Sequence, residues 1–398
     1  NLYLEETDYR FIVDSQDYRI LEEQFERGEI RSLPEPPKMN YARSLRLLKK
    51  LVKNYPSYEY RDAAYYLLGY IYYDDLSEQQ DDLRAREVYH EMVAEVPDSQ
   101  YTASGFFMLG EIYFEELDFD QSIYHYQKVL DLGDEDLYER TMYKLAWAYY
   151  RKDDLQNAIP RFVQLIEYAD ERALEAEPGK AAQLRPESIK YLAISLVDQA
   201  DDAFMSPTER VGAFFVKTGD KPFEGEIYAQ IDSVLFQQGR YDEELENLLY
   251  ILERWPNNPK NPDYQYKVMQ LHYMKDNPDP DAAVAARIEL VEKFKEGSDW
   301  WEANKGNPDA LRKAAGYIES SLGDVARTYH ASAQGMFTTP GEEPARSEYL
   351  KAAAAYQDYL NRFPFAKDAY ETQYQIAECY YWSADYPRAI TEYAKLDK

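Results

Sequence analysis

The feature that most constrains the fold of this chain is a helical pattern, closed by proline, that recurs along it. Runs of apolar residues at helical spacing end at Pro56, Pro97, Pro256 and Pro364, each preceded by an aromatic residue or valine. Proline ends a helix because it lacks the amide N–H and disfavours helical geometry in the residue before it. Each of these prolines is therefore predicted to end one helix and to open the turn into the next.

Two further patterns accompany the prolines. The helix that a proline ends carries a small or polar residue followed by large residues four and seven positions later, which lie on one helical face. These sets are Ser44, Leu48 and Leu51; Ala85, Tyr89 and Met92; Glu244, Leu248 and Ile251; and Ala352, Tyr356 and Tyr359. The partner helix carries Gly69, Gly110, Ala146 or Ala377 between large residues, and a small residue there lets the neighbouring helix approach closely. Offsets of twelve and sixteen residues link Gly110 to Ser122 and Tyr126, Ala146 to Ala158 and Phe162, and Ala377 to Ala389 and Tyr393.

Together these patterns resemble the tetratricopeptide repeat (TPR), and the resemblance runs from about Asn40 to Lys398. It implies an all-α fold, an α-solenoid or superhelix of about seven to nine TPR-like helix pairs with irregular insertions. An entering helix is expected at 41–54. Helix pairs are expected at 61–97, 101–134, 137–170, 187–216, 224–256, 262–296 and 308–364, with a last pair from 367. Segments rich in proline, glycine and charge predict loops at Glu171–Pro186, Gly297–Pro308 and Gly335–Arg346.

The repeat pattern also divides the chain. Residues 1–38 lack it and are predicted to form an N-terminal cap or arm, with a helix over Tyr9–Arg27 and a proline-rich linker over Leu33–Pro37. Residues 39–216 and 217–398 are assigned to two TPR arrays, the second truncated in its last repeat. Because the chain begins with Asn1 and not methionine, a signal peptide or lipid anchor lost from upstream stays open, as does continuation past Lys398.

The charge is strongly one-sided. There are 74 acidic against 45 basic residues, for a net charge of −29. Such a surface repels phosphate backbones and anionic lipid heads, so nucleic-acid and direct membrane binding are not expected. No run of about 18 apolar residues occurs, which argues against a membrane span. The expected partners are proteins with basic or mixed-charge surfaces that offer a peptide or a helix.

No catalytic residue, cofactor site or metal site is predicted, and the chain is not expected to be an enzyme. Cys379 lies in an apolar helical pattern, and His90, His125, His272 and His330 are scattered over different repeats without ligand spacing. The acidic clusters around Asp81, Asp118 and Asp134 lack the layout of a calcium loop. They fall between helices, where carboxylates complement the start of the next helix.

Aromatic residues supply the candidate partner-binding sites. The chain has 40 tyrosines, and a tyrosine on a helix face buries its ring while its hydroxyl reaches water or a carbonyl. In the helix expected from residue 61, the side chains of Tyr65, Tyr66, Tyr70 and Tyr73 cannot all point into one core. Some are therefore expected on an acid-rimmed, concave face formed by first helices. The candidates are Tyr66, Tyr70, Tyr73, Tyr143, Trp147 and Tyr150, together with Trp300 and Trp301, of which one is expected to be packed and the other to anchor a partner.

Some repeats end in Tyr-Pro or Phe-Pro and are followed by a first helix with a segment such as Ala64–Gly69. These repeat ends resemble bacterial envelope TPR proteins of the BamD and CpoB kind. The segments Tyr143–Arg151, Leu184–Ala193 and Gly219–Glu224 are similar to large myxobacterial TPR proteins, some of which serve gliding motility. This resemblance implies an exported, non-catalytic scaffold in the periplasm or at the outer membrane. Two alternatives stay open: the superhelical arm of a cell-wall enzyme, such as a lytic transglycosylase, with its catalytic domain outside this chain, or a module that binds a saccharide or another small ligand.

Overall fold

The computed structural model of this chain describes residues 2–175, 184–198, 205–275, 277–336 and 339–396. Within these residues the chain is α-helical, and its one β-type contact is an isolated bridge between Met39 and Ser77. The chain divides into two compact units, Asn1–Ser195 and Leu196–Lys398. The boundary between the units lies inside α9 (Arg185–Asp198).

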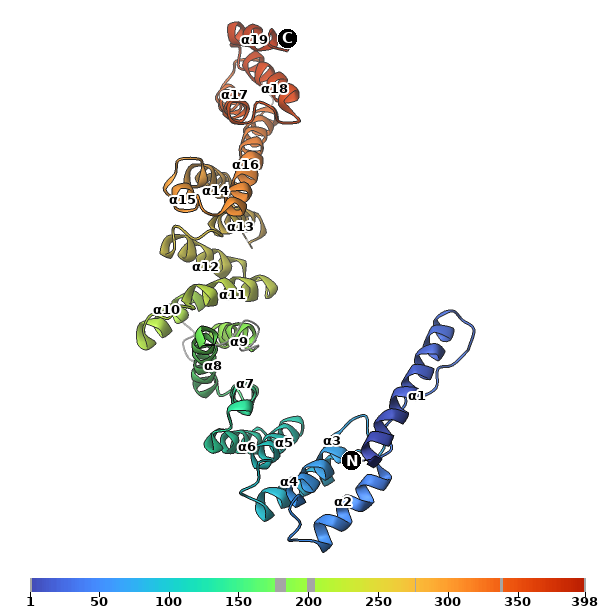
Figure 1. Cartoon of the computed structure of the whole chain (residues 1–398). Helices are drawn as coiled ribbons and strands as arrows, with labels where there is room; N and C mark the ends of the chain where they lie inside the picture. Colours follow the sequence, from blue (N-terminus) through green and yellow to red (C-terminus); the bar gives the residue numbers. More distant parts are fainter. Residues whose placement is uncertain (1, 176–183, 199–204, 276, 337–338, 397–398) are drawn as a thin grey trace. The chain divides into compact units, whose positions relative to one another are not determined.

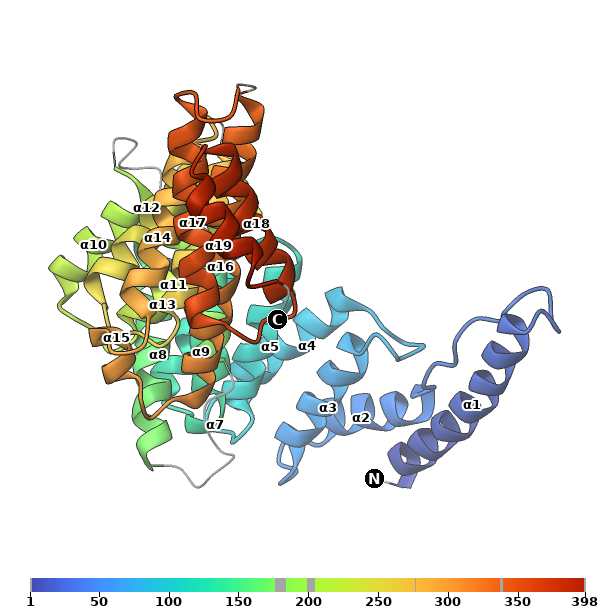
Figure 2. The same ribbon diagram turned by 90° about the horizontal axis from the view of Figure 1, so that it is seen from above.

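The first unit is a succession of helices in which each packs on the next (Figures 1 and 2). Its helices are α1 (Leu2–Glu26), α2 (Ala42–Asn54), α3 (Arg61–Tyr73), α4 (Asp82–Glu95), α5 (Thr102–Glu115), α6 (Phe119–Leu132), α7 (Glu135–Arg151) and α8 (Leu155–Glu175). Contacts between sequence neighbours run without a break from α2 to α8, whereas α1 touches α2 only lightly. The predicted entering helix and the first three predicted helix pairs are confirmed.

The second unit repeats this arrangement. Its helices are α10 (Pro207–Thr218), α11 (Glu224–Gln237), α12 (Tyr241–Arg254), α13 (Asn261–Met274), α14 (Pro280–Phe294), α15 (Asp299–Ala303), α16 (Pro308–Gly335), α17 (Ala345–Arg362), α18 (Ala369–Trp382) and α19 (Tyr386–Tyr393). From α11 onward each long helix packs on the next, and the short α15 packs on α14. The predicted all-α solenoid of helix pairs is confirmed. The arm at 1–38 and the division at residue 216 stay predictions.

Two predicted loops contain helix. The segment Glu171–Pro186 was predicted to be irregular, yet α8 continues to Glu175 and α9 begins at Arg185, while residues 176–183 lie outside the described part. The segment Gly297–Pro308 contains α15, because Ser298 accepts a hydrogen bond from the Trp301 amide and so caps a short helical turn. The N-terminal helix is also longer than predicted, since it begins at Leu2.

Aspartate side chains cap the N-termini of several helices. Asp81, Asp118 and Asp134 each accept a hydrogen bond from a backbone amide in the first turn of α4, α6 and α7, respectively. An aspartate at this position satisfies an amide that the helix itself leaves unpaired, and it contributes typically about 1 kcal/mol. The predicted role of these acidic clusters at helix starts is confirmed for the three.

Helices of a pair cross where an aromatic ring covers a glycine. A Cβ atom added to Gly69 would lie 2.6 Å from Tyr89 Cζ, and one added to Gly110 would lie 2.5 Å from Tyr126 Cε1. Both rings are fully buried, so neither can move aside. The glycine of the first helix is therefore needed for the close approach of the second.

In two pairs a carboxylate next to the small residue of the first helix, Gly110 or Ala377, satisfies the hydroxyl of the ring. Tyr126 donates a hydrogen bond to Glu111, and Tyr393 donates to Glu378 at the same offset of 15 residues. In the α3–α4 pair Tyr70 takes the place of this glutamate, and the buried hydroxyl of Tyr89 has no hydrogen-bond partner within the described residues. Packing therefore decides that an aromatic residue stands at this position. The hydrogen bond of its hydroxyl forms in some repeats only.

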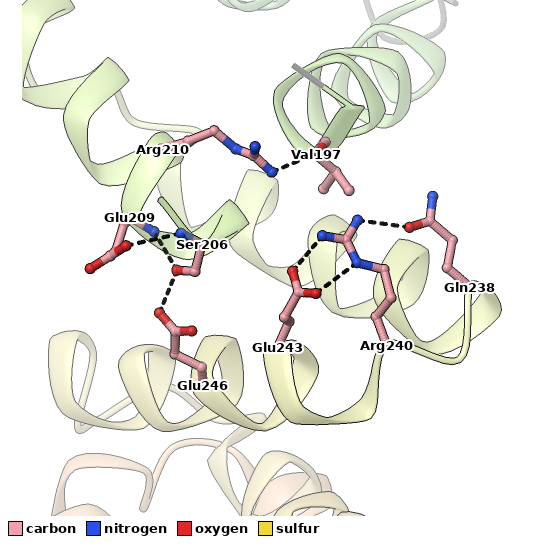
Figure 3. Close-up of polar contacts among 8 residues, drawn as sticks. All are labelled: Val197, Ser206, Glu209, Arg210, Gln238, Arg240, Glu243 and Glu246. Atoms are coloured by element: carbon pink, nitrogen blue, oxygen red, sulfur yellow. Dashed lines mark hydrogen bonds and ion pairs between the residues drawn. The ribbon is translucent and has the colours of Figure 1, made fainter. Parts of the chain in front are cut away.

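The start of the second unit is held by polar side chains (Figure 3). Ser206 accepts a hydrogen bond from the Glu209 amide while the Glu209 side chain accepts one from the Ser206 amide, which closes a capping box at the start of α10. The Ser206 hydroxyl also donates to Glu246 of α12 at 2.5 Å, and Arg210 Nη2 donates to the Val197 carbonyl at 2.8 Å. These contacts fix α10 against α12 and the end of α9.

The α11–α12 pair carries acids at its helix crossing. Asp232 and Glu244 stand where the α5–α6 pair has Gly110 and Ser122, and Glu244 is completely buried. Lys267 of α13 contacts both, with its Nζ 2.9 Å from Asp232 Oδ1 and 2.5 Å from Glu244 Oε1. Burial raises the pKa of the Glu244 carboxyl to about 7, against the opposing effect of the Lys267 charge. A carboxylate pair bound by the next repeat has replaced apolar packing here.

We predict that replacing Gly110 with alanine loosens the α5–α6 pair, since the added methyl group meets the buried Tyr126 ring. Overpacking of this kind costs roughly 1–3 kcal/mol. Hydrogen–deuterium exchange in peptides from α5 and α6 should accelerate. Gly316→Ala in α16 is the control, because nothing lies within 4 Å of the added Cβ and alanine favours the helix. Equal exchange in the Gly110→Ala variant and the wild type would show that the ring does move.

The Glu244 carboxyl is predicted to make stability fall as pH rises. Its pKa is raised in the folded chain from 4.5 to about 7, so the folded state holds a proton that the unfolded state has lost in this interval. The wild type should lose more unfolding free energy between about pH 5 and pH 8 than Glu244→Gln, by roughly 1–3 kcal/mol. Urea unfolding of both proteins across this range measures the difference. Parallel curves for the two proteins would contradict the assignment to Glu244.

Candidate partner-binding surfaces

The tyrosines of α3 divide between core and surface. Tyr65 and Tyr72 are buried, and Tyr66 is half-buried with its ring stacked 5.2 Å from that of Tyr101. Tyr73 is half-buried and donates a hydrogen bond of 2.7 Å to Glu115. The Tyr70 side chain is 44% exposed, and it is the α3 candidate with a ring open to a partner. Partial burial, followed by the charge of Asp74, raises the pKa of its hydroxyl.

The candidates on α7 form one aromatic cluster with a residue of α9. The Trp147 ring lies 4.3 Å from that of Tyr191, 5.6 Å from that of Tyr150 and 6.3 Å from that of Tyr143. All four side chains are partly exposed. The cluster therefore packs α7 against α9 and also offers aromatic edges at the surface.

The two adjacent tryptophans lie in different surroundings. Trp300 is buried, its ring meets Phe294 edge-on at 5.1 Å, and its Nε1 donates a hydrogen bond of 2.7 Å to the Asn258 carbonyl. The neighbouring Trp301 is half-buried. A buried ring with its polar atom satisfied cannot anchor a partner, so Trp300 has a packing role and Trp301 is the candidate of this pair.

Two histidines that are distant in sequence meet in the first unit. The His90 and His125 rings are 5.4 Å apart, Tyr113 stacks on His125 at 5.3 Å, and the Tyr113 hydroxyl lies 2.9 Å from His90 Nε2. Burial, followed by the charge of His90, lowers the pKa of His125 to about 4, which keeps it neutral near pH 7. No sequence pattern predicts this meeting, because it depends on how two neighbouring pairs stack.

The described residues hold no group of three or more His, Cys, Asp or Glu side chains arranged to bind a metal ion. Cys379 is fully buried, and burial raises the pKa of its thiol to about 12. A thiol that stays protonated and inaccessible is a poor nucleophile. The predicted core role of this residue is confirmed.

A groove and a basic helix at the start of the repeats were not foreseen. The groove lies between α2 and α3 and is also lined by Tyr3 and Leu4 of α1, with a volume of about 470 Å³. Its lining is largely apolar and includes Leu47, Leu48 and Leu51 of α2 and Tyr60 and Leu67. α2 has five basic residues and no acidic one, in a chain of net charge −29. These 13 residues are basic in an otherwise acidic chain, and this could have been recognised in the sequence.

Among the described residues, no helix is both apolar enough and long enough to cross a lipid bilayer.

Comparison with known proteins gives one family and several solved structures. A family model described as tetratricopeptide repeat matches residues 140–170, which cover most of α7 and α8. A comparison with curated proteins finds no match. The chain is similar to a structure of Naa15/Naa10 bound to HypK-THB, with 16% identity and a TM-score of 0.34, over 96% of this chain and 58% of that one. This chain thus spans little more than half the length of that neighbour.

Two other solved structures span nearly their full length in the comparison. A Rap protein complexed with competence and sporulation factor has 16% identity and a TM-score of 0.25, over 83% of this chain and 98% of that one. The C-terminal part of a TPR repeat-containing protein from Cytophaga hutchinsonii has 13% identity and a TM-score of 0.23, over 67% and 98%.

The family assignment rests on the chain's own repeats. Helix pairs follow one another through both units, a glycine and an aromatic ring meet at the α3–α4 and α5–α6 crossings, and the family match falls on the α7–α8 pair. The chain therefore contains a tetratricopeptide repeat at residues 140–170, within a succession of helix pairs.

Proposed function

We propose that this protein is a non-catalytic protein–protein interaction scaffold, part of a bacterial cell-envelope assembly or of a motility or trafficking machine. The observation that carries the proposal is the presence of aromatic side chains at the surface of helices whose other faces are packed. Tyr70, Trp147 and Trp301 are of this kind. Rigid, partly exposed aromatic rings supply much of the binding energy in protein interfaces.

The charge around these rings favours basic or mixed-charge partners. Tyr70 lies close enough to Asp74 and Asp8 for their charges to raise its pKa, and Tyr73 is bonded to Glu115. A peptide or helix with lysine or arginine beside an apolar residue would match both features of this face. We place the partners along the face formed by the first helices of the pairs, as a tyrosine-rich, acidic concave surface.

The envelope location is the part of the proposal that rests on sequence resemblance. The proline-ended repeats and the segment Tyr143–Arg151 are similar to periplasmic and outer-membrane TPR proteins, which are exported scaffolds. We propose the same compartment for this protein.

Site-specific photo-crosslinking in the native cell tests the proposal. A photoreactive phenylalanine analogue placed at Tyr70, Trp147 or Trp301 should give discrete protein adducts. The same analogue at Val216, which is 88% exposed on α10, is the control for chance encounters. Adducts from an envelope fraction would support both parts of the proposal. Adduct patterns identical to those of the control at all three sites would refute the scaffold surface.

The adjacent tryptophans give a matched pair of variants. Replacing the buried Trp300 with alanine should lower the stability of the second unit by about 3–5 kcal/mol, since it removes a packed ring and its hydrogen bond. Replacing Trp301 with alanine should leave the unfolding transition nearly unchanged and weaken crosslinking to a partner. Circular dichroism during thermal unfolding reads the first effect, and adduct yield from a crosslinker placed nearby, at Glu302, reads the second. Equal loss of stability in both variants would show that Trp301 is also a core residue.

A further inference from the structure

The first helix of the chain has an apolar face that the described residues leave uncovered. Tyr9, Ile12 and Ile20 are 69%, 55% and 55% exposed, and Val13 beside them is also exposed. Their spacing of three, four and seven residues places them in one stripe along α1. α1 carries eight carboxylates against two arginines, and among them Asp17 and Glu23 flank the stripe. α1 is therefore an acidic helix with an unpartnered apolar stripe.

The opposite kind of surface lies on α2. Its groove with α3 is lined by leucines and tyrosines, among them Tyr3 and Leu4 from the first turn of the same copy's α1, and Leu47 is 51% exposed. Arg46 and Lys50 stand beside Leu47 on the exposed side of α2. Within the described part of the chain neither of them is in an ion pair, whereas Arg43 contacts Glu6 at 3.9 Å. The groove is therefore an apolar surface with basic side chains along one edge.

Within one copy, α1 and α2 meet only near their N-terminal ends. The Arg43 guanidinium lies over the Tyr3 ring at 5.7 Å, and Thr7 Oγ1 donates a hydrogen bond of 3.3 Å to the Asn40 carbonyl. Beyond these contacts the two helices diverge (Figures 1 and 2). The stripe from Tyr9 to Ile20 thus does not reach the groove of its own copy.

We propose that the α1 stripe of one copy binds the α2–α3 groove of a second copy. The match is one of chemistry: an apolar stripe with acidic flanks meets an apolar groove with a basic edge. Each copy offers both surfaces, so a two-fold arrangement makes the contact twice. The net charge of −29 opposes association only weakly, because charges beyond about 8 Å are screened at physiological ionic strength. This inference is independent of the proposed scaffold function.

Mixed crosslinking of the full chain tests the contact directly. One population carries Ile12→Cys and the other Leu47→Cys, two exposed positions in the proposed surfaces. A disulfide between the two populations under mild oxidation can only join different copies, and the proposal expects it as the main product. Leu249→Cys, exposed on α12, replaces Leu47→Cys in the control. A yield no higher than that of the control overturns the proposal, as does a wild-type chain that stays monomeric at every concentration in light scattering.

Charge exchange gives the second test. Arg46→Glu with Lys50→Glu should raise the dimer dissociation constant at least about tenfold. Mixing this variant with Asp17→Lys, Glu23→Lys chains should recover association, because both contacts of the mixed dimer then join opposite charges. Lys217→Glu with Lys260→Glu makes the same change of net charge in the second unit and should leave the dimer intact. A dimer that the Arg46 and Lys50 substitutions do not weaken would place the interface elsewhere and overturn the proposal. Circular dichroism confirms that each variant is folded.

Discussion

The architecture depends on the close approach of paired helices at their crossing, which the α3–α4 and α5–α6 pairs reach by placing an aromatic ring on a glycine. Where Tyr126 lies on Gly110, the ring fills the space that a side chain would occupy, and the two helices approach as closely as their backbones allow. Each pair so formed still has an apolar outer side, which it buries on the next pair in sequence. In the first unit this contact holds the α3–α4 and α5–α6 pairs, and each pair then packs on the next.

Departures from the pattern show which parts of it packing requires. Asp232 and Glu244 replace the small residues of the α11–α12 crossing, and Leu248 replaces the aromatic ring, which leaves room for both carboxylates. Lys267 of α13 then binds the acids, as Lys144 of α7 binds Glu111 of the preceding pair at 2.7 Å. The lysine of this ion pair thus stands at the same position of the following repeat in both cases. Its acidic partner differs: Glu111 follows the small residue of its helix, whereas Asp232 takes the place of that residue. Ion pairs can therefore stabilise a helix crossing that has no aromatic ring, although burial there raises the pKa of the Glu244 carboxyl.

Helices, pair boundaries and the role of capping acids could be predicted from the sequence, because proline, small residues and apolar spacing act locally. Loops were predicted less well: α15 forms in a polar segment, where Ser298 caps it and Trp300 donates a hydrogen bond to the distant Asn258 carbonyl. The candidate sites, too, could be predicted only in part from the sequence. Periodicity showed that the α3 tyrosines could not all be buried, but only the stacking of neighbouring pairs decides that Tyr66 meets Tyr101 while Tyr70 stays exposed. The meeting of His90 and His125 is likewise a property of stacked pairs.

The confinement of contacts to sequence neighbours has a consequence for how such a protein changes over time. In a globular core, altering one surface residue often requires compensation from segments far along the chain. Here a hairpin that gains a new surface side chain has only the two adjoining hairpins to satisfy. Recognition properties can therefore diverge one hairpin at a time, and duplication of a hairpin adds surface without disturbing what is already there.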